Sequence, residues 1–259
     1  MRFATALDIA TLCIRHPGVL LGRKKYLFLF SHMRSYSSLL AHILGSNPGI
    51  NGHSERLRPY RNKRDLLRLR LTDYRETRET GHEFLLDKIL HNQYRVEEQI
   101  LELPSLRPVF FLRPPGETYQ SIHNMGRNIL KDEAYCDLDA IHSYYRERLD
   151  ELVRYSSIVA DRAIYFDAAM LVDQPDELLG QLSTWLSLQT PLQKQFTVFE
   201  DTGQNLKGDP SGNLQSGEIR KTEGRERIEI PAAMLAEADA HYHQCRERLM
   251  NNCRTIVAG

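Results

Sequence analysis

Short apolar runs recur along the first two thirds of the chain. They occupy residues 26–30, 84–90, 109–112 and 163–166. Each run is about as long as one buried strand, and an uninterrupted apolar run is typical of a parallel strand covered on both faces. The pattern therefore predicts the strands of a central, mostly parallel sheet.

Between and after these runs, apolar residues return at helical spacing. This spacing predicts helices over residues 37–45, 116–125, 138–157, 176–186 and 231–250. Strands that alternate with helices indicate βαβ units, and hence an α/β fold: a three-layer sandwich with helices on both faces of the sheet.

One domain is expected to span residues 1–259, with a helical extension at 1–24 and a lid-like loop at 200–225. The chain has 259 residues, of which 41% are hydrophobic and 26% charged, an ordinary composition for one globular core. Basic and acidic residues balance at 34 each, which argues against a general polyanion binder and against a nucleic-acid partner. Any anion site must therefore be local.

The N-terminal apolar stretch, residues 4–14, is interrupted by Asp8 and is too short to cross a bilayer. A cytoplasmic protein with no transmembrane segment is expected, although an amphipathic helix resting on a membrane would look similar. A homodimer stays open. The cysteines contain no C-x-x-C pair, so reduced structural thiols are expected and no zinc site is indicated: Cys13, Cys136, Cys245 and Cys253.

The first candidate site lies where the apolar run 26–30 passes through a polar turn into a helix. The free N–H groups and the positive end of the helix dipole form an anion site in this geometry. Arg34 adds a full charge, while Ser37 and Ser38 add hydroxyl groups. Alternatively, Ser37 only caps the helix and Arg34 is solvated. The turn lacks G-x-x-x-x-G-K-[ST], which disfavours an ATP-dependent kinase.

A second candidate site follows the run 109–112. Arg113 comes at the carboxyl end of this strand, where open α/β sheets bind ligands, and Ser121 follows eight residues later. A guanidinium group can bind a phosphate through two parallel hydrogen bonds. The alternatives are a salt bridge at the strand end for Arg113 and a surface hydroxyl for Ser121.

These two segments, in this order, resemble the donor-binding motifs of the sulfotransferases that use 3'-phosphoadenosine-5'-phosphosulfate (PAPS). Residues 34–40 resemble the 5'-phosphosulfate loop R-S-G-T-T-L-L, with Tyr36 in place of glycine. Arg113 and Ser121 match the 3'-phosphate motif R-x-P-x-x-x-x-x-S. The resemblance implies a P-loop-NTPase-like sulfotransferase fold, 3',5'-adenosine bisphosphate as the product and no metal. It also implies donor contacts from Arg34, Ser35, Tyr36, Ser37, Ser38, Arg113 and Ser121.

Weaker parts of the resemblance lie downstream. The segment 163–186 is similar to the family's Y-E-x-L-x-x-x-P region, which implies a place for Tyr165 in the adenosine pocket. Trp185 is expected to pack in the core. The loop 200–225 stands where family members carry a basic lid, which implies donor contacts from Arg220 and Lys221; a solvated loop is the alternative.

For the chemical step, cationic groups must stabilise the departing phosphate oxygen. Lys88 matches the lysine that ends a central strand in the tyrosylprotein sulfotransferases, and with Arg34 it is the candidate for this role. The alternative is that Lys88 lies on the surface, paired with Asp87.

The acceptor also needs a general base. Glu55 follows Arg34 by 21 residues, a spacing that resembles that of the catalytic glutamate of the tyrosylprotein sulfotransferases, and partial burial is expected to raise its pKa. His53 and His91 are the rivals for this role, His91 because cytosolic sulfotransferases use a histidine just beyond the strand-end lysine.

The sequence thus indicates a sulfotransferase that moves a sulfuryl group from PAPS to a hydroxyl or amine. Small-molecule, glycan, lipid and peptide acceptors all stay open. The basic segment 56–78 favours an acidic acceptor, unless it is simply a solvated amphipathic helix. The alternative functions are a nucleotide-dependent kinase or other phosphoryl transferase, and a non-catalytic nucleotide-binding protein of the same fold.

Overall fold

The computed structural model describes residues 22–79, 81–200, 202, 212–220 and 227–257. Its centre is a six-stranded sheet with the order β2-β3-β1-β4-β5-β6, in which every pair of neighbouring strands is parallel. The strands are β1 (Lys25–Phe30), β2 (Ile50–Asn51), β3 (Phe84–Ile89), β4 (Leu106–Leu112), β5 (Ile164–Asp167) and β6 (Arg254–Thr255).

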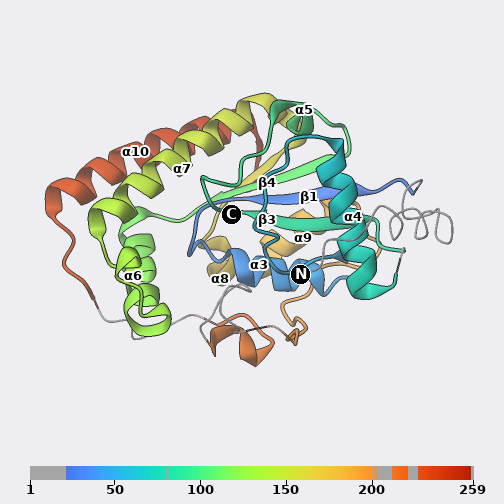
Figure 1. Cartoon of the computed structure of the whole chain (residues 1–259), viewed down its shortest axis with the longest axis horizontal. Coiled ribbons are helices and arrows are strands. Elements are labelled where there is room, and N and C mark those ends of the chain that lie inside the picture. The colour runs from blue at the N-terminus through green and yellow to red at the C-terminus, as the bar shows by residue number, and fades with distance from the viewer. Residues whose placement is uncertain (1–21, 80, 201, 203–211, 221–226, 258–259) are drawn as a thin grey trace.

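Helices cover both faces of this sheet, as Figure 1 shows. The α-helices are α3 (Ser37–Gly45), α4 (Lys63–Thr77), α5 (Glu98–Leu101), α6 (Pro115–Met125), α7 (Leu138–Val159), α8 (Met170–Asp173), α9 (Pro175–Leu186) and α10 (Ala232–Asn252). Shorter turns are the π-helix η1 (Gly126–Leu130) and the 3-10 helices η2 (Glu133–Tyr135), η3 (Ala160–Arg162) and η4 (Gly212–Ser216).

The apolar runs form strands because both of their faces are buried. In β1, Phe28 and Phe30 face a core that also holds residues of α7 and α10, whereas Leu27 and Leu29 face a second core shared with α3 and α9. Side chains alternate across a strand, so a strand between two layers needs a run with no polar interruption. The expected α/β three-layer fold is confirmed, and the sheet is parallel throughout.

A capping residue sets the start of α4. Asn62 accepts a hydrogen bond from the Arg64 backbone N–H at 2.9 Å, and the Asp65 carboxylate accepts one from the Asn62 N–H at 3.2 Å. This reciprocal pair is a capping box, worth about 1 kcal/mol to the helix. It makes part of the basic segment helical, as α4.

Several expected segments fall wholly or mainly outside the described residues. These are the helical extension, apart from its last residues, and most of the loop 200–225, including Lys221. Trp185 is half-buried and packs against the core that contains α3 and α9, as expected. Among the described helices, none combines the length and the apolar character that crossing a membrane requires.

Candidate active site

The candidate residues gather where three neighbouring strands end. In the sheet order, β1 lies between β3 and β4. Arg34 lies in the turn after β1, Lys88 is the last residue but one of β3, and Arg113 directly follows β4. The carboxyl ends of parallel strands share one edge of the sheet, which is where α/β folds bind ligands.

The turn after β1 has an unusual backbone. Arg34 and Tyr36 both adopt the left-handed conformation, with φ of 63° and 65°. Glycine adopts this conformation freely, whereas other residues adopt it at a cost of about 1–3 kcal/mol. Tyr36 therefore has a backbone conformation that a glycine at this position would adopt freely. The Tyr36 ring also makes a cation–π contact, because the Arg113 guanidinium carbon lies 4.4 Å from the ring centroid.

The serines of this turn have different roles. Tyr36, not Ser37, is the N-cap residue of α3, so the expected alternative in which Ser37 caps the helix is wrong. The Ser38 hydroxyl accepts a hydrogen bond from the Lys88 ammonium at 3.0 Å. Ser35 is fully buried and its hydroxyl donates to the His32 carbonyl at 2.7 Å, so only its backbone is left to contact a donor.

The two phosphate motifs meet directly. Arg34 Nε donates to Ser121 Oγ at 3.0 Å, and Arg113 Nη1 donates to the Arg34 carbonyl at 3.1 Å. Ser121 is buried rather than a surface hydroxyl. The salt bridge expected as the alternative for Arg113 is present, because its Nη2 lies 2.6 Å from Glu117 Oε2. The Arg113 side chain is nevertheless buried at the strand end, with 7% of it exposed. Its partner Glu117 lies at the surface, with 61% of its side chain exposed.

A neutral histidine links the two motifs. The backbone N–H of Arg113 donates to His32 Nε2 at 3.0 Å, so the ring proton is on Nδ1, which lies 2.9 Å from the Met33 carbonyl. Complete burial of the ring lowers the pKa of His32 from 6.5 to about 3. The ring is therefore uncharged at neutral pH, and it fixes the backbone of Arg113 against the first turn.

Glu55, Lys88 and His91 form a second polar group at the same edge. The Lys88 ammonium lies 3.3 Å from Glu55 Oε1, and His91 Nε2 lies 3.3 Å from Glu55 Oε2. The Lys88 side chain is 0% exposed and that of Glu55 is 12% exposed. Burial tends to raise the pKa of Glu55, but the Lys88 charge and the hydrogen bond to His91 outweigh burial and hold the pKa below 4.5. The expected rise in this pKa is wrong for the protein alone, because sequence reasoning did not foresee the buried ammonium beside the carboxylate.

The chain that carries Glu55 is held against β3. Gly52 has φ of 116°, and a Cβ atom there would come within 2.4 Å of the Leu86 carbonyl oxygen, so only glycine allows this approach. Further along, the buried Asp87 carboxylate accepts from the Arg56 N–H at 2.9 Å and from the Tyr60 hydroxyl at 2.5 Å. Asp87 thus holds the backbone next to Glu55. Lys88 is buried, so its expected alternative as a surface partner of Asp87 is wrong.

His53, the other rival base, belongs to an aromatic group. Its ring stacks on Phe199, with 3.7 Å between centroids and 7° between planes, and lies 5.6 Å from the ring of His42. His42 Nε2 in turn is 2.9 Å from Thr202 Oγ1. His91, by contrast, contacts Glu55 directly, so of the two histidines it is the one that the structure joins to the candidate base.

Tyr165 and Arg220, which are both expected to contact the donor, each bond to an acidic side chain of the protein. Tyr165 is completely buried and its hydroxyl donates to Asp167 at 2.7 Å, which makes it part of the core rather than of an adenosine pocket. It is buried like its neighbours because both faces of β5 are covered: Tyr165 belongs to the core that contains α7 and α10, and Phe166 to the core that contains α3 and α9. Arg220 is exposed and pairs with Glu218, with Nε 2.9 Å from Oε1.

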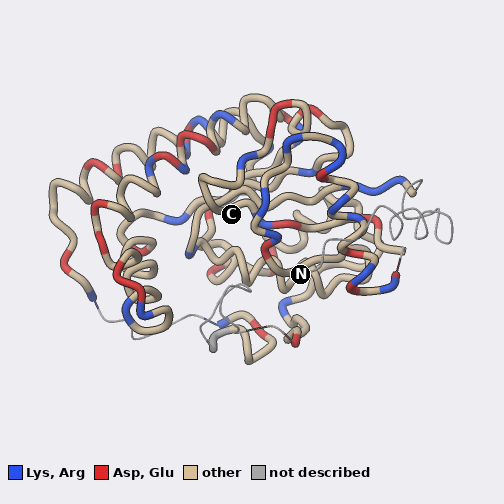
Figure 2. Tube along the Cα trace, viewed as in Figure 1, with Lys and Arg blue, Asp and Glu red and all other residues tan. Residues whose placement is uncertain are grey.

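Some arginines of the basic segment 56–78 bind other side chains of the protein. Arg56 pairs with Glu76 at 2.7 Å, and Arg70 donates to the Tyr26 hydroxyl at 2.7 Å. Figure 2 shows basic and acidic positions interspersed along this part of the chain. The exposed basic residues are Arg61, Lys63, Arg64, Arg68, Arg75 and Arg78. A preference for acidic acceptors stays a prediction that rests on these exposed positions.

Sequence reasoning missed the contribution of α7. Arg148 is fully buried, and it donates from Nε to the Ser31 carbonyl at 2.8 Å and from Nη2 to the Ile89 carbonyl. It thereby joins the carboxyl ends of β1 and β3. Nothing in the sequence distinguishes this arginine from the exposed charges that an amphipathic helix usually carries.

Two adjacent tyrosines of α7 complete this support. Tyr144 donates to the Leu90 carbonyl at 2.7 Å and accepts from the Met33 N–H at 2.8 Å. Tyr145 donates to the Arg113 carbonyl at 2.7 Å. One helix therefore holds the ends of all three strands that carry the candidate residues.

The parallel sheet, with cationic side chains at one edge, defines an α/β protein. Solved structures that are similar to it include two sulfotransferases. A sulfotransferase domain from the curacin biosynthetic pathway matches 85% of this chain and 98% of its own, with a TM-score of 0.58 and 15% identity. The sulfotransferase STF9 from Mycobacterium avium matches with 92% and 81% coverage, a TM-score of 0.53 and 10% identity.

At these identities the likeness shows the fold, which is therefore a sulfotransferase-like α/β fold. No family model matches the sequence, and no curated protein matches it either.

Proposed function

We propose that the protein transfers a sulfuryl group from PAPS to a hydroxyl or amine acceptor. The observation that carries this proposal is the position of the buried Lys88 ammonium. It lies 3.0 Å from the Ser38 hydroxyl of the donor loop and 3.3 Å from the Glu55 carboxylate. One cation thus joins the group that would hold the leaving phosphate to the group that would take the acceptor proton.

Donor binding would use both ends of the turn. The N-terminus of α3, with Ser37 and Ser38, would hold the 5'-phosphosulfate, since helix N-termini bind anions. Arg113 and Ser121 would hold the 3'-phosphate, which distinguishes PAPS from ordinary adenylates. The contact between Arg34 and Ser121 supports this arrangement, because it joins one motif to the other.

The chemical step is an in-line displacement at sulfur. The acceptor oxygen or nitrogen forms a bond to sulfur and its proton passes to Glu55, while the bond between sulfur and the 5'-phosphate oxygen breaks. The electron pair of that bond stays on the leaving 3',5'-adenosine bisphosphate, where Lys88 and Arg34 stabilise the added charge.

The low pKa of Glu55 fits a donor-dependent base. In the protein alone, the Lys88 ammonium favours the ionised carboxylate. A phosphosulfate next to Lys88 would offset this charge and leave burial, which raises the pKa, as the larger influence. Glu55 would then accept a proton more readily when the donor is bound, with His91 as its hydrogen-bonding neighbour.

Ligand stabilisation separates this proposal from its alternatives. We expect 3',5'-adenosine bisphosphate to raise the melting temperature without added metal, and ATP with magnesium to raise it less. Arg113→Ala should weaken binding of the bisphosphate about 10-fold to 100-fold, because a charge-assisted pair is lost. Arg154→Ala, an exposed arginine paired with Glu151, is the matched control. Stabilisation by magnesium–ATP alone would favour the phosphoryl-transferase alternative.

Measuring sulfuryl transfer tests the proposed role of Glu55 as the general base. With radiolabelled PAPS and a panel of phenols, alcohols, sugars and amines, Glu55→Gln should lower transfer about 10²-fold to 10⁴-fold, because a general base is lost. Bisphosphate binding should be kept. Glu102→Gln, at an exposed position, is the control. Normal turnover in Glu55→Gln would assign the base to a histidine, and bisphosphate binding without transfer to any acceptor would favour the non-catalytic alternative.

A further inference from the structure

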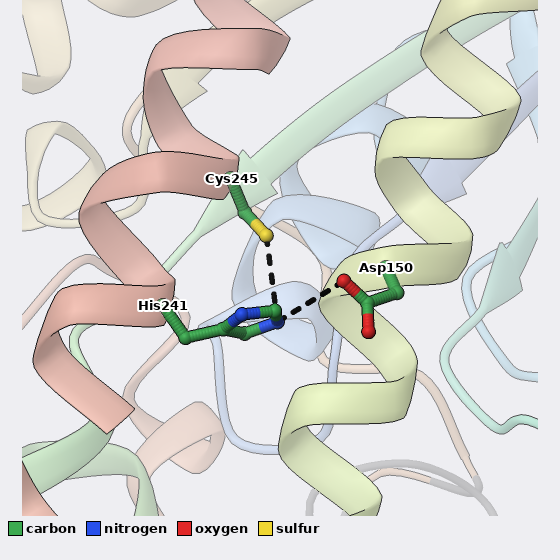
Figure 3. Close-up of side chains that lie close together, drawn as sticks. All are labelled: Asp150, His241 and Cys245. Atoms are coloured by element: carbon green, nitrogen blue, oxygen red, sulfur yellow. Dashed lines mark hydrogen bonds and ion pairs between the residues drawn. The ribbon is translucent and has the colours of Figure 1, made fainter. Parts of the chain in front are cut away.

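Three potential metal ligands meet between α7 and α10, two helices that lie side by side on one face of the sheet (Figure 1). Asp150 comes from α7, and His241 and Cys245 come from α10 (Figure 3). His241 Nε2 is 3.5 Å from Cys245 Sγ and 3.2 Å from Asp150 Oδ1, and the three ligand atoms all lie within 4.8 Å of one another. None of these residues takes part in the candidate active site.

The helices fix these positions. His241 and Cys245 are four residues apart, so they occupy one face of α10, one turn from each other. The neighbouring residues Leu149, Tyr242 and Leu249 are buried in the core that α7 and α10 share. The ligand atoms are therefore presented by two packed helices, which suits a site that needs defined geometry.

A nucleophilic triad does not fit this arrangement. In such a triad the thiol contacts one ring nitrogen and the carboxylate orients the imidazole through the other. Here Cys245 and Asp150 both contact Nε2 of His241. Cys245 is also only 2% exposed, so a substrate has little access to the sulfur. Three ligand atoms that converge on one point fit a bound cation better than a nucleophilic triad.

We propose that Asp150, His241 and Cys245 bind a zinc ion that joins α7 to α10. Thiolate, imidazole and carboxylate are all zinc ligands, and zinc favours a tetrahedron with bonds of about 2.0–2.3 Å. The edges of such a tetrahedron are about 3.3–3.6 Å long, and the two contacts to Nε2 have closely similar lengths, 3.5 and 3.2 Å. One negative charge each from Cys245 and Asp150 balances the charge of Zn²⁺.

Binding requires a simple exchange of protons and water. The Cys245 thiol releases its proton to solvent and forms the zinc–sulfur bond, His241 keeps its proton on Nδ1 and binds through Nε2, and zinc loses coordinated water. The Asp150 side chain is 64% exposed, which gives the ion a path from solvent and leaves space for a water as the fourth ligand.

By joining α7 to α10, the ion would stabilise the packing of these helices on the sheet. Next to Cys245, Arg246 binds the Asp167 carboxylate at the end of β5 through contacts of 2.8 and 2.6 Å. On the other side, α7 holds the strand ends through Arg148 and its neighbouring tyrosines. The site is structural and does not depend on the proposed sulfuryl transfer.

Zinc binding by the full chain tests the proposal. After the protein is stripped with a chelator, titration calorimetry should show one zinc ion bound per chain, and zinc should raise the melting temperature. Cobalt should bind at the same site with the intense near-ultraviolet band of a thiolate ligand. His241→Ala and Cys245→Ser should each weaken zinc binding at least about 10-fold, since even indirect support of a metal ligand has that effect.

The controls keep the outcome decisive. His243→Ala removes an exposed histidine from the same helix and should leave zinc binding unchanged. Asp150→Asn alters an exposed side chain, so it should fold normally, which circular dichroism can check, and should bind zinc more weakly. The proposal is overturned if the wild type binds no zinc, or if His241→Ala and Asp150→Asn bind it as tightly as His243→Ala does.

Discussion

The turn after β1 and the helix α7 support the same site in different ways. The turn presents contiguous residues, and its shape comes from its own backbone, with Arg34 and Tyr36 both left-handed. Helix α7 is distant in sequence and contributes Tyr144, Tyr145 and Arg148, each of which bonds a strand end. The turn thus supplies the chemical groups, while α7 fixes where the strands that carry them end.

At neutral pH, the substitution with the largest effect on stability should be the removal of Arg148. Arg148→Ala leaves a cavity and removes the hydrogen bonds to the Ser31 and Ile89 carbonyls, so the free energy of unfolding should fall by about 3 kcal/mol. Arg148→Met fills the space without carrying a buried charge and should cost less. Urea unfolding measures both changes.

Arg154→Ala, at an exposed position of the same helix, should change stability by no more than about 0.5 kcal/mol. If Arg148→Ala proves equally mild, α7 does not hold the strand ends, and the contrast between the two regions disappears.

A second prediction concerns pH and the contact between the turn and the second motif. Burial lowers the pKa of His32 to about 3, whereas the unfolded chain titrates near 6.5. Below 6.5 the unfolded state binds a proton that the folded state does not. Stability present above pH 6.5 should therefore fall as the pH drops toward 3, by up to about 1.4 kcal/mol per pH unit.

His32→Gln tests this assignment, because its amide offers an acceptor to the Arg113 N–H without titrating. Urea unfolding above and below pH 6.5 should show a smaller pH dependence for the variant than for the wild type. Equal slopes would mean that another group causes the loss of stability.

The sequence predicted the parts of the molecule that rest on local patterns. The apolar runs predicted four of the six strands. Arg34, Arg113 and Ser121 were selected because each motif is short and follows a strand, and the structure brings the three residues together. The short strand β6 lacks such a signal, because two residues cannot show a period.

Contacts between distant elements could not be predicted. The low pKa of Glu55 depends on Lys88, 33 residues further on, and the burial of Tyr165 depends on distant helices, including α7 and α10, that cover its face of β5. The proposed zinc ligands likewise come from two helices about 90 residues apart in sequence, with no pattern that joins Asp150 to His241.

The smallest effect should come from Tyr36, where the turn's own backbone is tested. Glycine at this position would relieve the left-handed strain, by about 1 kcal/mol, but would lose the contact of the ring with the Arg113 guanidinium, worth about 0.5–1 kcal/mol. The two changes oppose each other, so Tyr36→Gly should alter the free energy of unfolding by less than about 1 kcal/mol. Tyr36→Ala loses the ring and keeps the strain, so it should be less stable than Tyr36→Gly by about 1 kcal/mol in urea unfolding. Equal stability of the two variants would show that the left-handed backbone at this position carries no strain, and that the ring alone explains why a tyrosine is tolerated there.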